Sequence, residues 1–105
     1  MTLGDKQRLF AKLVPRLIDK AHELGYEVTL GHAFRCQDCH VGAENSNHKK
    51  CLAIDLNLFL DKKYLTKTED HQLLGTWWEQ QHALCRWGGR FNDGNHYSLE
   101  HEGVK

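Results

Sequence analysis

The chain has very little proline and no net charge. It contains one proline in 105 residues, and its 14 Lys and Arg residues balance 14 Asp and Glu residues. Because 40% of the residues are hydrophobic and 10% are aromatic, the composition argues against a disordered chain. A neutral chain also lacks the field of one sign that nucleic acids and anionic membranes attract. We therefore expect one folded domain over residues 1–105 and no nucleic-acid partner.

A long hydrophobic run is also missing at the N-terminus. Residues 1–17 alternate charged and apolar side chains, which is typical of neither a signal peptide nor a membrane anchor. We expect synthesis in a cytoplasm and no membrane insertion. The four cysteines are then expected to remain thiols or to bind metal instead of forming disulfides. Eight histidines, a high number for this length, direct the search towards metal sites.

Hydrophobic periodicity predicts a long amphipathic helix that stops at Gly25. Pro15 lies inside it and predicts a kink or a late helix start. Alternating patterns predict strands over residues 26–30 and 52–59. In the second strand Asp55 lies on the face opposite the core. The expected core side chains of these segments are Leu9, Phe10, Leu13, Val14, Leu17, Ile18, Ala21, Leu24, Leu52, Ile54, Leu56 and Leu58.

The second half of the chain predicts a hairpin, a helix and a last strand. We expect a hairpin turn at residues 61–63, and we expect Thr66 or Thr68 to be the N-cap of a helix. Glycines at 88–89 predict a bend, and residues 92–94 a turn before a strand that places His96 and Ser98 on one face. Together the segments predict an α+β fold with helices packed on one side of a small, mostly antiparallel sheet. The apolar residues that outline the expected second helix are Leu73, Leu74, Trp77, Trp78 and Leu84.

Three side chains are candidate zinc ligands, namely His48, Asp55 and His96. Two imidazoles and one carboxylate leave an open position for water, as hydrolytic zinc requires. Asp93, three residues before His96, is a candidate general base. Arg35 is a candidate cation for an oxyanion or a substrate carboxylate. The alternative for each residue is an ordinary surface or salt-bridged role.

The segment "CQDCH" permits two other metal sites. Cys-x-x-Cys-His is the attachment motif of c-type haem, but the only methionine is Met1, which leaves no internal methionine as axial ligand. The second alternative is a structural zinc site with Cys36, Cys39 and two further ligands. The candidates for those two are His40, His48, Cys51 and Cys85. Among the tryptophans, at least one of Trp77 and Trp78 is expected in the core, while Trp87 is a candidate for lining a substrate groove.

Three segments together resemble a known peptidase family. "GYEVTLGHAFR", "SNHKKCLAIDLNLF" and "WGGRFNDGNHYSL" are similar to the zinc D-alanyl-D-alanine carboxypeptidases and L-alanyl-D-glutamate endopeptidases, and specifically to short phage endolysins. The family motif Ser-x-His, four residues, Ala-x-Asp is matched from Ser46 to Asp55. A second motif, with an acidic residue three before a histidine and after Trp-Gly-Gly, is matched by Asp93 and His96. The family's arginine after the first strand is matched by Arg35.

The resemblance implies a role for each matched residue. It implies zinc ligation by His48, Asp55 and His96, general-base catalysis by Asp93, and contact of Arg35 and Ser46 with substrate or transition state. It also implies a small α+β fold of the hedgehog and D-alanyl-D-alanine peptidase type. The chain departs from the family at Cys51, where glycine is common, and at His32, where relatives often have an acidic residue. The loop after Arg35 also lacks a Thr or Ser and a Gln that many relatives have.

The expected function is therefore zinc-dependent hydrolysis of bacterial peptidoglycan stem peptides by a monomer. The enzyme would be made in the cytoplasm of a bacterial host and act on the cell wall after release or delivery, as in phage lysis. The motifs do not distinguish L-Ala–D-Glu endopeptidase from D-Ala–D-Ala carboxypeptidase activity. Two alternatives remain open: a non-catalytic binding module stabilised by zinc at Cys36 and Cys39, and an inactive relative that binds wall peptides.

Overall fold

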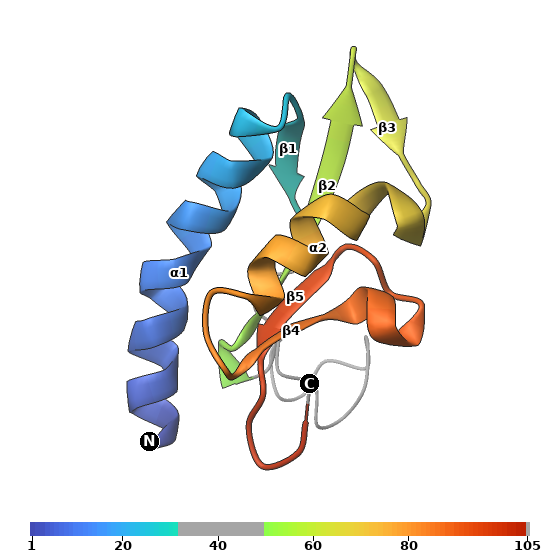
Figure 1. Ribbon diagram of the computed structural model, residues 1–105. Helices are drawn as coiled ribbons and strands as arrows, with labels where there is room; N and C mark the ends of the chain where they lie inside the picture. The colour runs from blue at the N-terminus through green and yellow to red at the C-terminus, as the bar shows by residue number, and fades with distance from the viewer. Residues whose placement is uncertain (32–49, 105) are drawn as a thin grey trace.

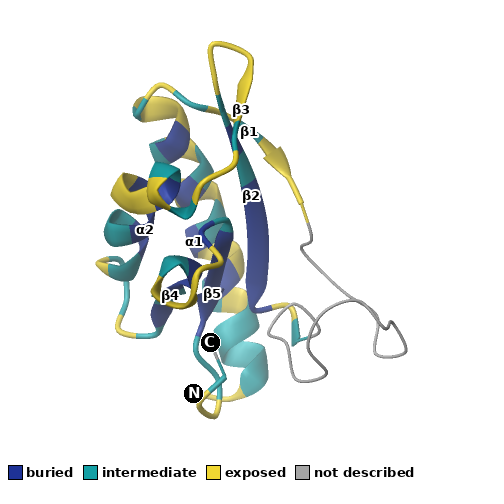
Figure 2. Cartoon of the chain, turned by 90° about the vertical axis from the view of Figure 1, so that its right-hand side faces the viewer, coloured by how far each residue is buried: buried dark blue, intermediate teal, exposed yellow. Residues whose placement is uncertain are grey.

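Two helices cover one face of an open antiparallel sheet (Figure 1, Figure 2). The computed structural model describes residues 1–31 and 50–104. In chain order the elements are α1 (Leu3–Glu23), β1 (Glu27–Leu30), β2 (Ala53–Leu60), β3 (Lys63–Leu65), the 3-10 helix η2 (Thr68–His71), α2 (Gln72–Glu79), β4 (Cys85–Trp87), the 3-10 helix η3 (Gly88–Phe91) and β5 (His96–Leu99). The architecture confirms the predicted α+β class, with both helices on one side of the sheet.

Strand β2 organises the sheet because it pairs with three other strands. One edge of β2 pairs with β1, and the strand order continues β1-β2-β5-β4. The other edge pairs first with β5, where Asp55 lies opposite His96, and further along with β3, where Leu58 lies opposite Leu65. Between these two pairings the Leu56 amide donates to the Asn95 carbonyl at 2.9 Å. Two strands therefore follow each other along one edge of β2.

Helix α1 begins at Leu3, so the predicted alternative of a late helix start at Pro15 is wrong. Thr2 caps the helix: its hydroxyl accepts from the Asp5 amide, and its own amide donates to the Asp5 carboxylate. These hydrogen bonds lower the pKa of Asp5. Pro15 lies inside the helix on an exposed position, where water can satisfy the carbonyl that proline leaves without a donor. Gly25, with φ of +94°, ends the helix as predicted.

The predicted hairpin is confirmed, and the predicted helix cap is wrong. Asp61 and Lys62 both have positive φ, 51° and 64°, which is the backbone of a two-residue type I′ turn between β2 and β3. The next segment does not begin with a threonine cap. Lys67 precedes η2, and the Asp70 carboxylate accepts a hydrogen bond from the Lys67 amide, so a 3-10 turn leads into α2. The following segment also contains a strand, β4, that the sequence pattern did not predict.

The core lies between the two helices and the inner face of the sheet. Helix α1 contributes one buried stripe, and β2 contributes the predicted alternate residues. Trp78 is fully buried, which confirms a core position for one of the paired tryptophans, whereas Leu73 is 66% exposed. Leu30 of the edge strand β1 is also exposed, against the expected alternation. The buried core side chains are Phe10, Leu13, Leu17, Ala21, Leu52, Ile54, Leu56, Leu58, Leu74, Trp78, Cys85, Trp87, Tyr97 and Leu99.

Candidate functional site

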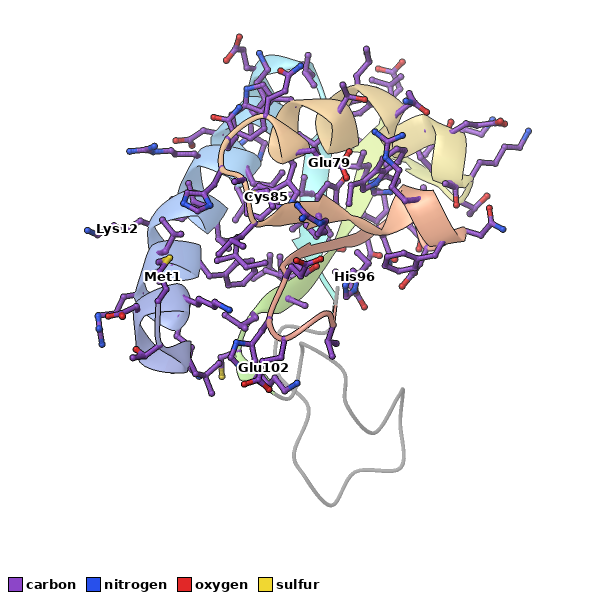
Figure 3. All side chains as sticks on the ribbon, turned by 60° about the horizontal axis from the view of Figure 1, so that its bottom comes forward. Met1, Lys12, Glu79, Cys85, His96 and Glu102 are labelled. Atoms are coloured by element: carbon purple, nitrogen blue, oxygen red, sulfur yellow. The ribbon has the colours of Figure 1, made fainter. Side chains whose placement is uncertain are left out.

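The pairing of β2 with β5 brings two predicted zinc ligands together. Asp55 and His96 are direct partners across the antiparallel ladder. Both side chains leave the core face, because Ile54 and Tyr97 beside them point inward. In Figure 3 the labelled His96 side chain lies beyond β5 as seen from α1. The hydrophobic alternation of the two strands is therefore what places both polar side chains on the outer face.

The distance between Asp55 and His96 suits two ligands of one metal ion. The Asp55 Oδ1 and His96 Nδ1 atoms lie 3.6 Å apart, and the two side chains are only 13% and 7% exposed. This separation exceeds the usual N–H···O range of about 2.7–3.2 Å. Two donors of a tetrahedral zinc, each about 2.0–2.1 Å from the metal, lie roughly 3.3 Å apart. The donor types and their spacing therefore fit two of the positions around a zinc ion.

Asp93 lies next to this pair on a tight turn. Its Oδ2 atom is 3.9 Å from His96 Nδ1, and its side chain is 54% exposed. Backbone hydrogen bonds hold the residue on both sides: its amide donates to the Gly88 carbonyl at 2.8 Å, and its carbonyl accepts from the His96 amide at 3.0 Å. The backbone is therefore fixed while the carboxylate remains accessible to water, as a general base requires.

The turn that carries Asp93 is built on Trp87 and glycine. A Cβ on Gly88 would lie 2.1 Å from the Asp93 carbonyl oxygen and 2.6 Å from the His96 Cβ. The Trp87 indole N–H donates to the Gly94 carbonyl at 2.7 Å, and its ring packs against Gly75 and Gly89. Trp87 itself is only 3% exposed. This burial favours a positioning role for Trp87 over the substrate contact that the sequence suggested.

The other predicted site residues lie outside the described part of the chain. They are Arg35, Cys36, Cys39, His40, Ser46 and His48, and the departure at His32 lies there as well. Within residues 1–31 and 50–104, no group of three or more His, Cys, Asp or Glu side chains is close enough to hold a metal ion. The described part of the site therefore consists of Asp55, His96 and the neighbouring Asp93.

The described cysteines differ from each other in their surroundings. Cys85 is buried in the core, and desolvation raises the pKa of its thiol to about 12. Cys51 is exposed and has φ of 56°. That left-handed conformation favours glycine, which is the residue common in the similar family.

Comparisons with known proteins do not assign the chain to a family. No family model matches it, and no curated protein matches it. No helix in the described ranges is both long and apolar enough to span a membrane. The functional argument therefore depends on the residues themselves and on their arrangement.

Sequence reasoning missed two features beside the site. The Phe91 ring, 47% exposed, meets the His96 ring edge to face with centroids 5.7 Å apart. Asn57, two residues after Asp55 on the same face, accepts long hydrogen bonds of 3.4 Å from Tyr64 and Asn95. The period-2 alternation does place Asn57 on the face of Asp55 but does not indicate its hydrogen bonds, whereas Phe91 has no local signal because η3 brings it back over β5.

His71 is a buried titratable group behind the site. Its Nδ1 atom lies 2.7 Å from the Tyr97 hydroxyl, and desolvation, opposed by the nearby Asp70 carboxylate, lowers the pKa of His71 to about 4. The folded state therefore favours the neutral imidazole. Its contribution to stability is complete above the unfolded pKa of 6.5 and is lost as pH falls towards 4. The maximum loss is about 3 kcal/mol.

We expect this loss to disappear in His71→Asn, which keeps a polar partner for Tyr97 but does not titrate. Urea unfolding at pH 7.5 and pH 4.5, with chelator present so that metal binding does not contribute, measures both proteins. Between pH 7.5 and pH 4.5 the free energy of unfolding should fall by about 2–3 kcal/mol more in the wild type than in the variant. An equal loss in both proteins would show that other groups carry the pH dependence.

Proposed function

We propose that the protein is a zinc-dependent peptidase that cleaves stem peptides of bacterial peptidoglycan. The observation that carries the proposal is the Asp55–His96 cross-strand pair, with its donor atoms 3.6 Å apart and Asp93 on the adjoining turn. The pair supplies two of the three ligands of a site with two histidines and one carboxylate, and Asp93 supplies a further carboxylate beside them. The resemblance of the three sequence segments supplies the substrate class, and His48 is the proposed third ligand.

Each residue has a distinct part in the proposed reaction. When bound, zinc lowers the pKa of a coordinated water and polarises the peptide carbonyl. Asp93 accepts a proton from the attacking water and then gives it to the leaving amine nitrogen. Arg35 stabilises the negative charge that develops on the carbonyl oxygen, and Ser46 binds the substrate. His96 and Asp55 hold their positions because the β2–β5 ladder fixes both backbones.

Digestion of purified sacculi tests the proposal and identifies the bond. The protein is incubated with sacculi, and released fragments are identified by mass spectrometry. New termini at L-Ala–D-Glu indicate endopeptidase activity, and loss of the terminal D-Ala indicates carboxypeptidase activity. A protein that binds zinc and sacculi but releases no fragment would instead be a wall-binding relative without activity. We propose that it acts as a monomer and reaches the wall after release or delivery from the bacterial cytoplasm.

We expect Asp55→Asn to remove zinc from the purified protein. The substitution keeps the size of the side chain but replaces a charged ligand, so bound zinc should fall from about one ion per chain to a small fraction of that. Asn57→Ala, on the same face of β2, is the matched control and should retain zinc. Elemental analysis after dialysis measures the metal, and circular dichroism checks the fold.

The same measurement separates the enzyme from a cysteine-bound zinc module. In the proposed enzyme, Cys36→Ser and Cys39→Ser leave zinc unchanged. Zinc that is lost only in these cysteine variants, and retained in Asp55→Asn, would contradict the peptidase proposal. The position of Cys85 inside the hydrophobic core already weighs against its use as a ligand in such a module.

A further inference from the structure

A polar pocket opens beside Asp93, between the end of β3 and the start of β5, which follow each other along one edge of β2. It has a volume of about 180 Å³. One wall is the segment from Tyr64 to Thr68, which leads from β3 into η2, and the other is the turn from Asn92 to Asn95 that precedes β5. Because Asp93 belongs to the second wall, the pocket adjoins the group proposed to act on the scissile bond.

The pocket is polar and contains one cationic side chain, Lys67, that is able to pair with a carboxylate of a ligand. Among its described lining residues, Lys67 and Asp93 are the charged side chains at neutral pH, because burial keeps His71 neutral with a pKa of about 4. The Lys67 ammonium lies 4.0 Å from the Glu69 carboxylate, and both side chains are about three-quarters exposed, at 74% and 76%. Such an exposed pair is weak, so it leaves Lys67 able to bind a second carboxylate.

Uncharged groups in the same walls can bind the rest of such a ligand. Thr66 and Asn92 are exposed, and Thr68 is half-buried. Their side chains make no hydrogen bond to any residue in the described ranges of the chain, so their hydroxyl and amide groups face water in the free protein. A ligand that replaces this water can form hydrogen bonds without breaking any within the protein.

The two walls are held at a fixed separation. A Cβ on Gly94 would lie 2.5 Å from the Thr68 Cα, so the turn and the η2 segment are in direct backbone contact. Asn92 has a left-handed backbone, with φ of 59°, and closes the turn. The volume lies below the range of roughly 300–1,000 Å³ that is usual for pockets that enclose a whole small-molecule ligand, so the pocket suits one side-chain group of a peptide. A preformed pocket of this size can select a single group.

We propose that this pocket binds a carboxylate of the peptide substrate, next to the bond that is cut, and that Lys67 determines this specificity. The inference rests on the proposed function, because Asp93 marks the position of the reacting bond. Lys67 does not take part in bond cleavage. It selects peptides in which an acidic group lies within one residue of the scissile bond, and it discriminates against the corresponding carboxamide.

Three synthetic stem peptides test the inference. The first has all its carboxylates free, the second carries an amide on the α-carboxyl of its γ-linked D-glutamate, and the third carries an amide at its C-terminus. Steady-state kinetics are measured for the wild type, Lys67→Gln and Lys67→Arg. Lys63→Gln is the matched control, because it removes a lysine from neighbouring β3 that does not line the pocket.

We expect one of the two amidated peptides to show a KM about tenfold higher with the wild type, and that peptide identifies the carboxylate that is bound. Lys67→Gln should raise the KM of the free peptide by a similar factor with little change in kcat, and should remove the preference. Lys67→Arg should retain most of the preference for the free carboxylate, and Lys63→Gln should match the wild type in KM and in preference. Equal KM values for all three peptides, or a preference that survives in Lys67→Gln, would overturn the inference and leave the peptidase proposal standing.

If the wild type cleaves none of the peptides, the peptidase proposal fails, and binding then tests the pocket alone. Titration of the same peptides, followed by backbone amide chemical shifts, gives dissociation constants without hydrolysis. A preference for the free carboxylate that Lys67→Gln removes, with shifts at residues 64–68 and 92–95, supports the pocket. Binding without that preference overturns it.

Discussion

Asp93→Asn is expected to lower kcat by about 10²–10⁴-fold while leaving zinc content and stability nearly unchanged. The amide cannot accept the proton that the carboxylate accepts. The fold should tolerate the exchange, because the side chain is 54% exposed and the structural contacts of Asp93 come from its backbone amide and carbonyl. Kinetics on released wall peptides, elemental analysis and thermal unfolding measure the three properties separately.

Asp19→Asn provides the control, since Asp19 is an exposed carboxylate on α1 and belongs to no part of the site. It should leave kcat unchanged. If Asp93→Asn keeps full activity with zinc bound, another group accepts the proton, and the assignment of Asp93 is wrong. If the variant loses zinc as well as activity, Asp93 supports the metal site instead of transferring the proton.

Gly88→Ala is expected to destabilise the protein by about 3 kcal/mol or more and to remove most of its activity. The new Cβ would lie 2.1 Å from the Asp93 carbonyl oxygen and 2.6 Å from the His96 Cβ. Neither neighbour is the flexible end of a side chain, so the backbone of the turn must move. Such a movement displaces the proposed base and one proposed ligand together. Urea unfolding gives the loss of stability, and zinc analysis shows whether His96 still binds.

Gly4→Ala is a useful comparison because the same change is made where there is room. A Cβ at Gly4 would lie 3.4 Å from the nearest side-chain atom of Arg8, an ordinary contact, in the first turn of α1. Alanine has the higher helix propensity, so this variant should be neutral or up to about 1 kcal/mol more stable. Equal stability of Gly88→Ala and the wild type would mean that the turn adapts without cost and does not fix Asp93.

The local pattern predicted those parts of the fold that depend on residues close together in the chain. Alternation over residues 52–58 correctly identified the core face of β2, because the pleat of a strand sends neighbouring side chains to opposite faces. The stop at Gly25 and the turn at Asp61 were predictable for a similar reason, since each needs an unusual backbone conformation at one or two positions. Thr2 and Asp5 also form a capping box, which is recognisable in the sequence because its two residues lie three positions apart.

Other features escaped prediction because they arise from contacts between distant segments. Strand β4 has only three residues, too few for a periodic pattern, and is defined by its pairing with β5. The burial of Trp87 also depends on distant residues, because two glycines, Gly75 and Gly89, leave space for its ring. The cap expected at Thr66 or Thr68 was wrong because Asp70 instead accepts from the Lys67 amide and starts a 3-10 turn.

The sequence by itself determined the α+β class, the polar face of β2 and the residue types of the proposed zinc site. These follow from side-chain chemistry and from the period of a strand, which are local properties. Only the tertiary structure decided that Asp55 lies opposite His96, because the register of two strands far apart in the chain depends on packing their inner faces against the helices. The pocket beside Asp93 was likewise decided by the fold, since it lies between the end of β3 and the start of β5 along one edge of β2.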